Sequence, residues 1–297
     1  MAVVNYAEAY ASALAQAYPY VLNFGELYNT ENRNKYKVVD AKTIKIPVLS
    51  TSGRVDGDRD TIGTFRRRHD NAWEVKELKN HRTWDTLIHP VDVQQSNMVM
   101  SIQNATKVYN EEQKFPEMDA YLVSKIHELK IAQDAGSDSN VVLTEDNVLS
   151  EFDKAMEAMD EAMVPQSGRI LYVTPAVKRL IKTAKNITRQ INLSANTGVL
   201  QREISRIDEV KIKNVPSSLM KTIYNFTDGW KPGVSTKQIN MFLVHPSSIL
   251  PVVSYSFASM QAPSALTKGK YLYFEESFED VFILNKRSKA IFFNVEA

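Results

Sequence analysis

Residues 115–133 read FPEMDAYLVSKIHELKIAQ and predict a helix with a defined start. Pro116 suits the first helical position, because the N–H that proline lacks would have no helical partner there. Glu117 and Asp119 then fall in the first turn, where the helix dipole favours anions. We expect a helix of about 27 Å. Its apolar stripe consists of Met118, Leu122, Ile126 and Leu129.

Upstream of this helix, residues 41–91 predict a long two-stranded ribbon with a polar tip. In AKTIKIPVL (41–49) apolar side chains alternate, while Pro47 points to the other face and confines the strand to an edge. The stretches AWEVKEL (72–78) and TWDTLIHPV (83–91) also read as extended. An isolated hairpin is marginally stable in water, so a ribbon of this length needs another surface to lie on.

The tip of the ribbon, VDGDRDTIGTFRRRH (55–69), carries both signs of charge: Asp56, Asp58 and Asp60, then Arg66, Arg67 and Arg68. The aspartate spacing is similar to that of a calcium loop, but the twelfth position counted from Asp56 is Arg67, a cation in place of the last anionic ligand. A solvated turn is the plain alternative. The arginines could contact phosphate, yet the acids and bases of the loop nearly balance, which leaves little net attraction for a polyanion.

Downstream, residues 143–163 predict another helix, with Thr144 as its N-cap and Val148, Phe152, Met156, Met159 and Met163 inward. The pattern then becomes that of an α/β lobe. Strands are expected at 169–173, 208–216 and 239–246, a helix capped by Thr174 at 174–184, and a short helical turn or strand at 247–253. Closing strands are expected at 271–276, 280–285 and 289–295, the last two as a hairpin around residues 285–288.

The composition and the missing motifs exclude several classes of protein. The 297 residues have a formal net charge of +1, which makes no general case for a nucleic-acid or membrane partner, and no apolar run approaches membrane-spanning length. The absence of cysteine excludes disulfides and thiolate sites. No glycine-rich phosphate loop, G-x-S-x-G elbow or H-E-x-x-H motif occurs. We therefore expect a soluble protein made in a cytoplasm, with no catalytic, cofactor or metal site.

The order of these segments resembles that of the major capsid protein of tailed bacteriophages, which has the Hong Kong 97-type fold. FPEMDAYLVSKI (115–126) is similar to the opening of the long spine helix of that family. KTIKIPVLSTSGRVDGDRD and WDTLIHPVDVQQSN resemble the start and the return of its extended loop. GRILYVTPAVKRLIK, INMFLVHPSSILPVV and YLYFEESFEDVFILNKRSKAIFFNV resemble its axial lobe and final strands.

The resemblance implies an α+β fold with four parts. These are an N-terminal arm (1–38), an extended β-hairpin loop (39–92), a peripheral domain with the spine helix (93–166 and 265–297) and an axial α/β domain (167–264). It implies a structural subunit that assembles into hexamers and pentamers of an icosahedral head around double-stranded DNA, which it contacts weakly and non-specifically. The location would be the virion capsid, assembled in the cytoplasm of a bacterial host. Partners would be other copies, a portal protein, and separate scaffolding or decoration proteins.

The resemblance also suggests what the charged ribbon contacts. We expect the aspartates at 56, 58 and 60 to face cations of one neighbouring subunit and Arg66, Arg67 and Arg68 to face acids of another, with Trp73 and Trp84 as further inter-subunit contacts. Two alternatives stay open. One is an encapsulin-like nanocompartment shell that packages an enzyme; the other is a soluble α/β oligomeric enzyme or binding module whose ribbon is a dimerisation arm.

Overall fold

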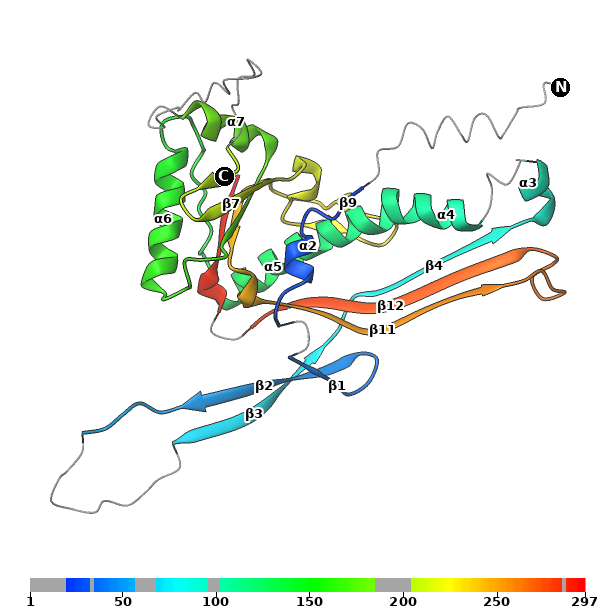
Figure 1. Ribbon diagram of the computed structural model, residues 1–297, viewed down its shortest axis with the longest axis horizontal. Coiled ribbons are helices and arrows are strands. Elements are labelled where there is room, and N and C mark those ends of the chain that lie inside the picture. Colours follow the sequence, from blue (N-terminus) through cyan, green and yellow to red (C-terminus); the bar gives the residue numbers. More distant parts are fainter. Residues whose placement is uncertain are drawn as a thin grey trace, which may run out of the picture.

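A long helical run, made of three consecutive segments, extends along the molecule (Figure 1). The computed structural model describes residues 20–32, 35–56, 68–95, 102–184, 204–284 and 287–296. Within them, α4 (Ile102–Tyr109) passes into a π-helical segment, η1 (Asn110–Lys114), and then into α5 (Phe115–Gln133). At 1.5 Å per residue the run is about 48 Å long.

The prediction that Pro116 begins the helix is therefore wrong for the run as a whole, although Pro116 does lie in the first turn of α5. In a regular α-helix the proline ring would clash with the carbonyl group four residues earlier, here that of Glu112. Glu112 lies in η1, where the N–H of Phe115 donates to the carbonyl of Asn110. The wider π turn relieves the clash, so the helix continues through a proline that normally ends one.

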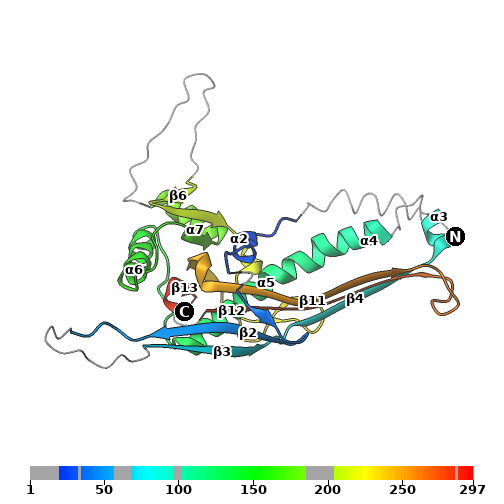
Figure 2. The same ribbon diagram turned by 60° about the horizontal axis from the view of Figure 1, so that its bottom comes forward.

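Three antiparallel strands lie along one side of this run, as Figure 2 shows. Their order is β11 (Ile249–Gln261), β12 (Tyr271–Ile283) and β4 (His81–Ile88). Two predictions are corrected here. The segments expected as separate strands at 271–276 and 280–285 form the single strand β12, and β4 joins this sheet, so it is not the second strand of the ribbon.

The ribbon is a separate sheet of β1 (Lys37–Val38), β2 (Thr43–Thr51) and β3 (His69–Glu77). The two long strands pair antiparallel from Thr43 opposite Glu77 to Thr51 opposite His69. Because β1 pairs only with Ile44 and Lys45, the described strands leave β2 with a free edge at Pro47, as that proline predicts.

The five-stranded axial sheet has the order β13-β10-β5-β7-β6. Its strands are β5 (Ile170–Val173), β6 (Arg206–Ile207), β7 (Val210–Asn214), β10 (Ile239–Val244) and β13 (Ile291–Val295). The predicted closing hairpin is wrong, because β13 pairs with β10 in this sheet while β12 belongs to the other one. A small hairpin of β8 (Tyr224–Asn225) and β9 (Lys231–Pro232) lies beside the axial sheet.

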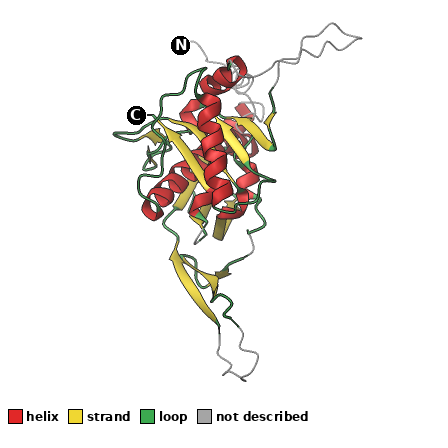
Figure 3. Ribbon diagram, turned by 90° about the vertical axis from the view of Figure 1, so that its left-hand side faces the viewer, coloured by secondary structure: helices red, strands yellow, loops and turns green. Residues whose placement is uncertain are grey.

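Helices cover both faces of the axial sheet. On one face pack α6 (Val148–Glu161) and α7 (Pro175–Thr183), and Figure 3 looks onto this side. Thr174 caps α7 as predicted, since its side chain accepts from the N–H of Val177 at 3.5 Å. The predicted cap of α6 is wrong: Asn147, not Thr144, is its N-cap. Met163 is also not inward, being 90% exposed at a φ of 55°.

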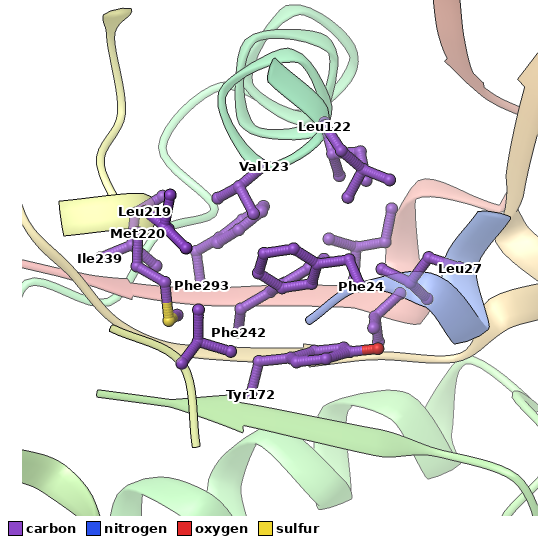
Figure 4. Packing of buried hydrophobic residues seen from close by; sticks show 14 of the residues in the cluster. Phe24, Leu27, Leu122, Val123, Tyr172, Leu219, Met220, Ile239, Phe242 and Phe293 are labelled. Carbon is purple, nitrogen blue, oxygen red and sulfur yellow. The ribbon is translucent and has the colours of Figure 1, made fainter. Parts of the chain in front are cut away.

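The opposite face of the axial sheet contains the largest core, shown in Figure 4. Side chains from α5 and from the short helix α2 (Gly25–Tyr28) meet strand residues there, among them Leu122, Val123, Phe24, Tyr172, Phe242 and Phe293. Phe242 stacks on Phe293 with ring centroids 4.6 Å apart. The sequence alternation explains this division, because Tyr172 and Phe242 point to this core while Leu171, Val173, Met241 and Leu243 point to α6 and α7.

The remaining short elements are α3 (Pro90–Gln95) and the 3₁₀ turns η2 (Ser217–Leu219), η3 (Pro246–Ser248) and η4 (Ser288–Ala290). Residues 247–253, expected as a turn or strand, pass from η3 into β11. Residues 1–19 of the expected N-terminal arm and the turn residues 285 and 286 lie outside the described residues. The division into four domains stays a prediction, although strand pairing puts β4 with β11 and β12, and β13 with the axial strands.

Candidate assembly surfaces

The base of the ribbon is held by its own chain. Ile44 is fully buried and Ile46 is 6% exposed. Both lie in a small core with residues of the β11–β12 sheet and the end of the ribbon, namely Leu78, Leu250, Val252, Phe278 and Phe282. The expectation that the whole segment from residue 41 to 91 depends on other surfaces is therefore wrong at its base.

Beyond the base, one face of the ribbon exposes apolar side chains to solvent, beside the polar residues Lys45 and Asn71. Pro47 on β2 lies opposite Trp73 on β3, and Lys45 lies opposite Val75. Residues two apart on a strand share a face, so Leu49 lies on the same side. Leu49 is 68% exposed, Trp73 54% and Val75 57%. We call the set Pro47, Leu49, Trp73 and Val75 the outer ribbon face.

Most of the charged tip lies outside the described residues, including Asp58, Asp60, Arg66 and Arg67. Asp56 is exposed. The guanidinium group of Arg68 donates to the carbonyl of Gly53 at 3.4 Å, and the carbonyl of Arg68 accepts from the N–H of Ser52 at 2.9 Å. Arg68 thus ties the two sides of the ribbon together near the tip, and its contact with a neighbour stays a prediction.

The two tryptophans predicted as inter-subunit contacts lie in different surroundings. Trp73 is on the outer ribbon face. Trp84 is half-buried on β4, where its ring stacks on Tyr109 of α4 with centroids 3.8 Å apart and leans on Tyr273. Trp84 therefore packs within its own chain, and of the pair only Trp73 presents a large open surface.

Glu117 fastens the helical run to the three-stranded sheet. Its carboxylate accepts from the Arg82 side chain on β4, with Nε 2.6 Å from Oε1 and one terminal nitrogen 2.9 Å from Oε2. Arg82 also donates to the carbonyl of Phe226 at 2.5 Å. Burial raises the pKa of Glu117 although Arg82 and Lys114 oppose the rise. Glu117 therefore pairs with a cation on the sheet. The sequence analysis places Glu117 in the first turn of a helix and does not predict this partner.

Asp119 is fully buried and holds the N-terminal segment against α5. One of its carboxylate oxygens accepts from the hydroxyl of Tyr20 at 2.5 Å and from the N–H of Asn23 at 2.8 Å, and the other accepts from the N–H of Phe24 at 3.3 Å. Burial raises the pKa of Asp119, and these hydrogen bonds oppose the rise. The sequence analysis does not identify Tyr20 and Asn23 as partners of Asp119. The only signal of such a contact in the sequence is an acid, Asp119, on a helix face that is otherwise apolar.

A cavity of about 110 Å³ lies between the helical run and the three-stranded sheet. Acidic and basic groups line it: Arg82, Lys114, Glu117, Glu275 and Glu279. Lys114 donates to Glu275 at 3.0 Å, and Arg82 pairs with Glu117. Among the described residues no ion pair to Glu279 lies within 4.0 Å, and burial raises the pKa of its carboxyl. One carboxyl group of this cavity is thus left without a close cation.

The sheet face turned away from the helical run is a second open surface, which the sequence does not reveal. The register puts Phe257, Phe274 and Leu87 on the face opposite Trp84 and Arg82. Phe257 is 44% exposed, Leu87 51% and the neighbouring Tyr255 38%. We call the set Leu87, Tyr255, Phe257 and Phe274 the open sheet face.

The described residues offer little for other kinds of site. No three histidine, aspartate or glutamate side chains among them gather so that they could hold a metal ion. No helix in the described part of the chain is long and apolar enough to cross a membrane.

Comparisons with known proteins identify the architecture. No protein-family model and none of the curated proteins matches the sequence. Among solved structures, a capsid chain of cyanophage P-SCSP1u is similar with a TM-score of 0.66 at 12% identity, over 95% of this chain and 90% of that one.

Two further structures agree. The mature capsid of bacteriophage PhiM1 gives a TM-score of 0.61 at 12% identity, over 85% of this chain and 81% of that one. A chain of Mycobacterium phage Che8 gives 0.60 at 11% identity, over 94% and 93%. Likeness at these identities concerns the fold, and it extends over most of every chain compared. The chain therefore has the Hong Kong 97-type fold of capsid proteins.

Proposed function

We propose that the chain is the structural subunit of a closed icosahedral shell, built from hexamers and pentamers. The observation that carries the proposal is the match in fold to a cyanophage capsid chain over 95% of this chain. The exposed outer ribbon face supports it, because an apolar face on a projecting two-stranded ribbon gains stability only when another surface covers it.

Among the surfaces of this chain, the open sheet face of a second copy is best suited to cover the outer ribbon face. Both surfaces expose apolar side chains, both carry aromatic rings, and they lie on different parts of the chain. A contact between two different patches of identical subunits repeats from copy to copy and closes into a ring when the rotation permits. The charged tip would then set the register of this contact, with aspartates and arginines facing opposite charges on neighbours.

For the contents of the shell we propose double-stranded DNA, which makes the chain the major capsid protein of a phage head assembled in a bacterial cytoplasm. Such a head would also need a portal protein, with scaffolding or decoration proteins as further partners. A nanocompartment that holds a protein cargo is the second candidate. The formal net charge of +1 favours it to some degree, because a near-neutral shell has little general attraction for DNA.

The decisive experiment compares particle formation by the wild type and by a double variant of the outer ribbon face, Leu49→Ser with Trp73→Ser. A matched control, Met163→Ser with Val234→Ser, changes two apolar residues that are 90% and 91% exposed elsewhere. We expect circular dichroism to show folded protein in all three. Size-exclusion chromatography and negative-stain microscopy should show closed particles for the wild type and the control, and small species for the ribbon variant.

A wild type that stays small under all assembly conditions would contradict the shell. Particles from the ribbon variant that match the wild type would remove the outer ribbon face from the contact. Nuclease-protected DNA inside particles purified from producing cells supports the phage head, and a packaged protein supports the nanocompartment.

A further inference from the structure

The helix α6 carries an acidic stripe that no described residue of the chain neutralises. Asp153, Glu157 and Glu161 follow one another at intervals of four residues, so they lie on one face of the helix, and all three are exposed. The other acids of α6 are paired, Glu151 with Lys154 at 2.8 Å and Asp160 with Arg169 at 2.5 Å. For the stripe, no ion pair within 4.0 Å occurs among the described residues.

This stripe weakens the helix that carries it. Like charges four residues apart repel by about 0.2–0.5 kcal/mol per pair. Glu161 lies in the last turn, where the helix dipole favours cations and where α6 has none. The three acids therefore contribute nothing favourable to the isolated subunit that the described contacts reveal.

The neighbouring helix α7 has the opposite character. It carries Lys178, Arg179 and Lys182, of which Arg179 is exposed and the two lysines are half-buried, and no acid occurs between Pro175 and Thr183. In the described part of the chain none of these three cations has an ion pair within 4.0 Å. Two helices thus hold three uncompensated charges each, of opposite sign.

Both helices lie at the same end of the molecule, on the same face of the axial sheet (Figures 1 and 3). Their apolar sides are used against that sheet, through Phe152 and Met159 of α6 and Val177 and Ile181 of α7. The charged side chains lie outside this core; the three acids of α6 and Arg179 of α7 are exposed. No salt bridge joins the two helices within the described chain.

We propose that the acidic stripe of α6 in one copy faces the basic side of α7 in the next copy around a ring. The proposal rests on the proposed shell function and adds which flanks of the axial domains meet. In such a ring a surface of one copy meets a different surface of the next copy, so the two surfaces must be complementary. Each exposed pair is weak, but the set fixes orientation and rejects wrong contacts.

The test is a charge swap. One variant combines Asp153→Lys, Glu157→Lys and Glu161→Lys, and a second combines Lys178→Glu, Arg179→Glu and Lys182→Glu. A third carries all six changes, which exchange the signs and preserve complementarity. We expect each one-sided variant to lower the yield of closed particles about tenfold, a factor equal to 1.4 kcal/mol, and the sixfold variant to restore it.

Wild-type particle formation serves as the reference and tests the shell function separately. If the wild type assembles and the one-sided variants assemble equally well, this contact is wrong while the shell stands. If the α7 variant loses only nucleic acid from otherwise normal particles, its cations bind a polyanion and the proposal is overturned. Should a lysine variant fail to fold, the neutral set Asp153→Asn, Glu157→Gln and Glu161→Gln replaces it. That set must flatten the salt dependence of assembly, and an unchanged dependence contradicts the contact.

Discussion

At the scale of the residue, three carboxyl groups in or beside the helical run have different partners because their surroundings differ. Asp119 accepts from backbone and side-chain donors, and Glu117 is paired with Arg82. Glu279 lines the cavity beneath the helical run and has no such partner among the described residues. Nothing in the local sequence distinguishes them, since the groups around them come from distant segments, such as Tyr20, which lies 99 residues before Asp119.

Glu279→Gln should stabilise the folded subunit at neutral pH. Burial raises the pKa of Glu279 above its ordinary value of 4.5, so the folded chain favours the protonated carboxyl. The stability that this group contributes is complete below 4.5 and is lost as the pH rises through the folded-state pKa. Glutamine resembles the neutral acid at every pH. Urea denaturation should therefore show the variant more stable than wild type at pH 7.5 and equal to it near pH 4; a loss at pH 7.5 would contradict this reading.

At the scale of the element, prediction succeeds where the determinants are local. Thr174 and Pro175 specify the start of α7 by themselves, and the alternation in 41–49 specifies β2. Strand partners are different, because pairing depends on which surfaces meet in the folded chain. The sequence therefore identifies β12 and β13 as extended but pairs them wrongly with each other. It also fails at Pro116, where an unusual π turn overrides a reliable local rule.

The anchored base and the open outer part of the ribbon should respond differently to substitution. Ile44→Ala leaves a cavity in a fully buried site and should cost about 2–5 kcal/mol in the free energy of unfolding. Leu49→Ala, on the exposed face of the same strand, should change it by less than about 0.5 kcal/mol. Urea denaturation measures both, and limited proteolysis should cut the ribbon faster only in the Ile44 variant. Equal effects would mean that the base is not held by the β11–β12 sheet.

At the scale of the whole molecule, the fold joins a body with two large cores to a ribbon whose outer face is exposed in the single chain. The two large cores lie on opposite faces of the axial sheet and consist of residues of this chain. The open sheet face and the outer ribbon face leave aromatic surface in water. The sequence predicts the ribbon and its need for a partner from its length and charge, whereas the sheet face depends on a register that the sequence does not specify.

Assembly should therefore protect the ribbon selectively in amide hydrogen exchange. In the unassembled subunit we expect fast exchange at Ser50 and Asn71 in the outer part of the ribbon, and slow exchange at its anchored base around Ile44. In closed particles the outer part should become slow as well. Strand β5 (Ile170–Val173), buried throughout, is the internal control and should exchange slowly in both states. Outer amides that stay fast in particles would show that neighbours leave the ribbon uncovered.

The course of the chain through its two sheets has a consequence for how such a subunit can vary in size. The chain leaves the axial sheet at Val244 and re-enters it at Ile291, and these two residues lie directly opposite each other. The strands β11 and β12 are thus an excursion from a body that closes behind them. Residues can be gained or lost at the far bend between Gln261 and Tyr271 without shifting a single pairing in the body. The same body can therefore carry β11–β12 arms of different length, so that subunits with one body can differ in the area that they cover.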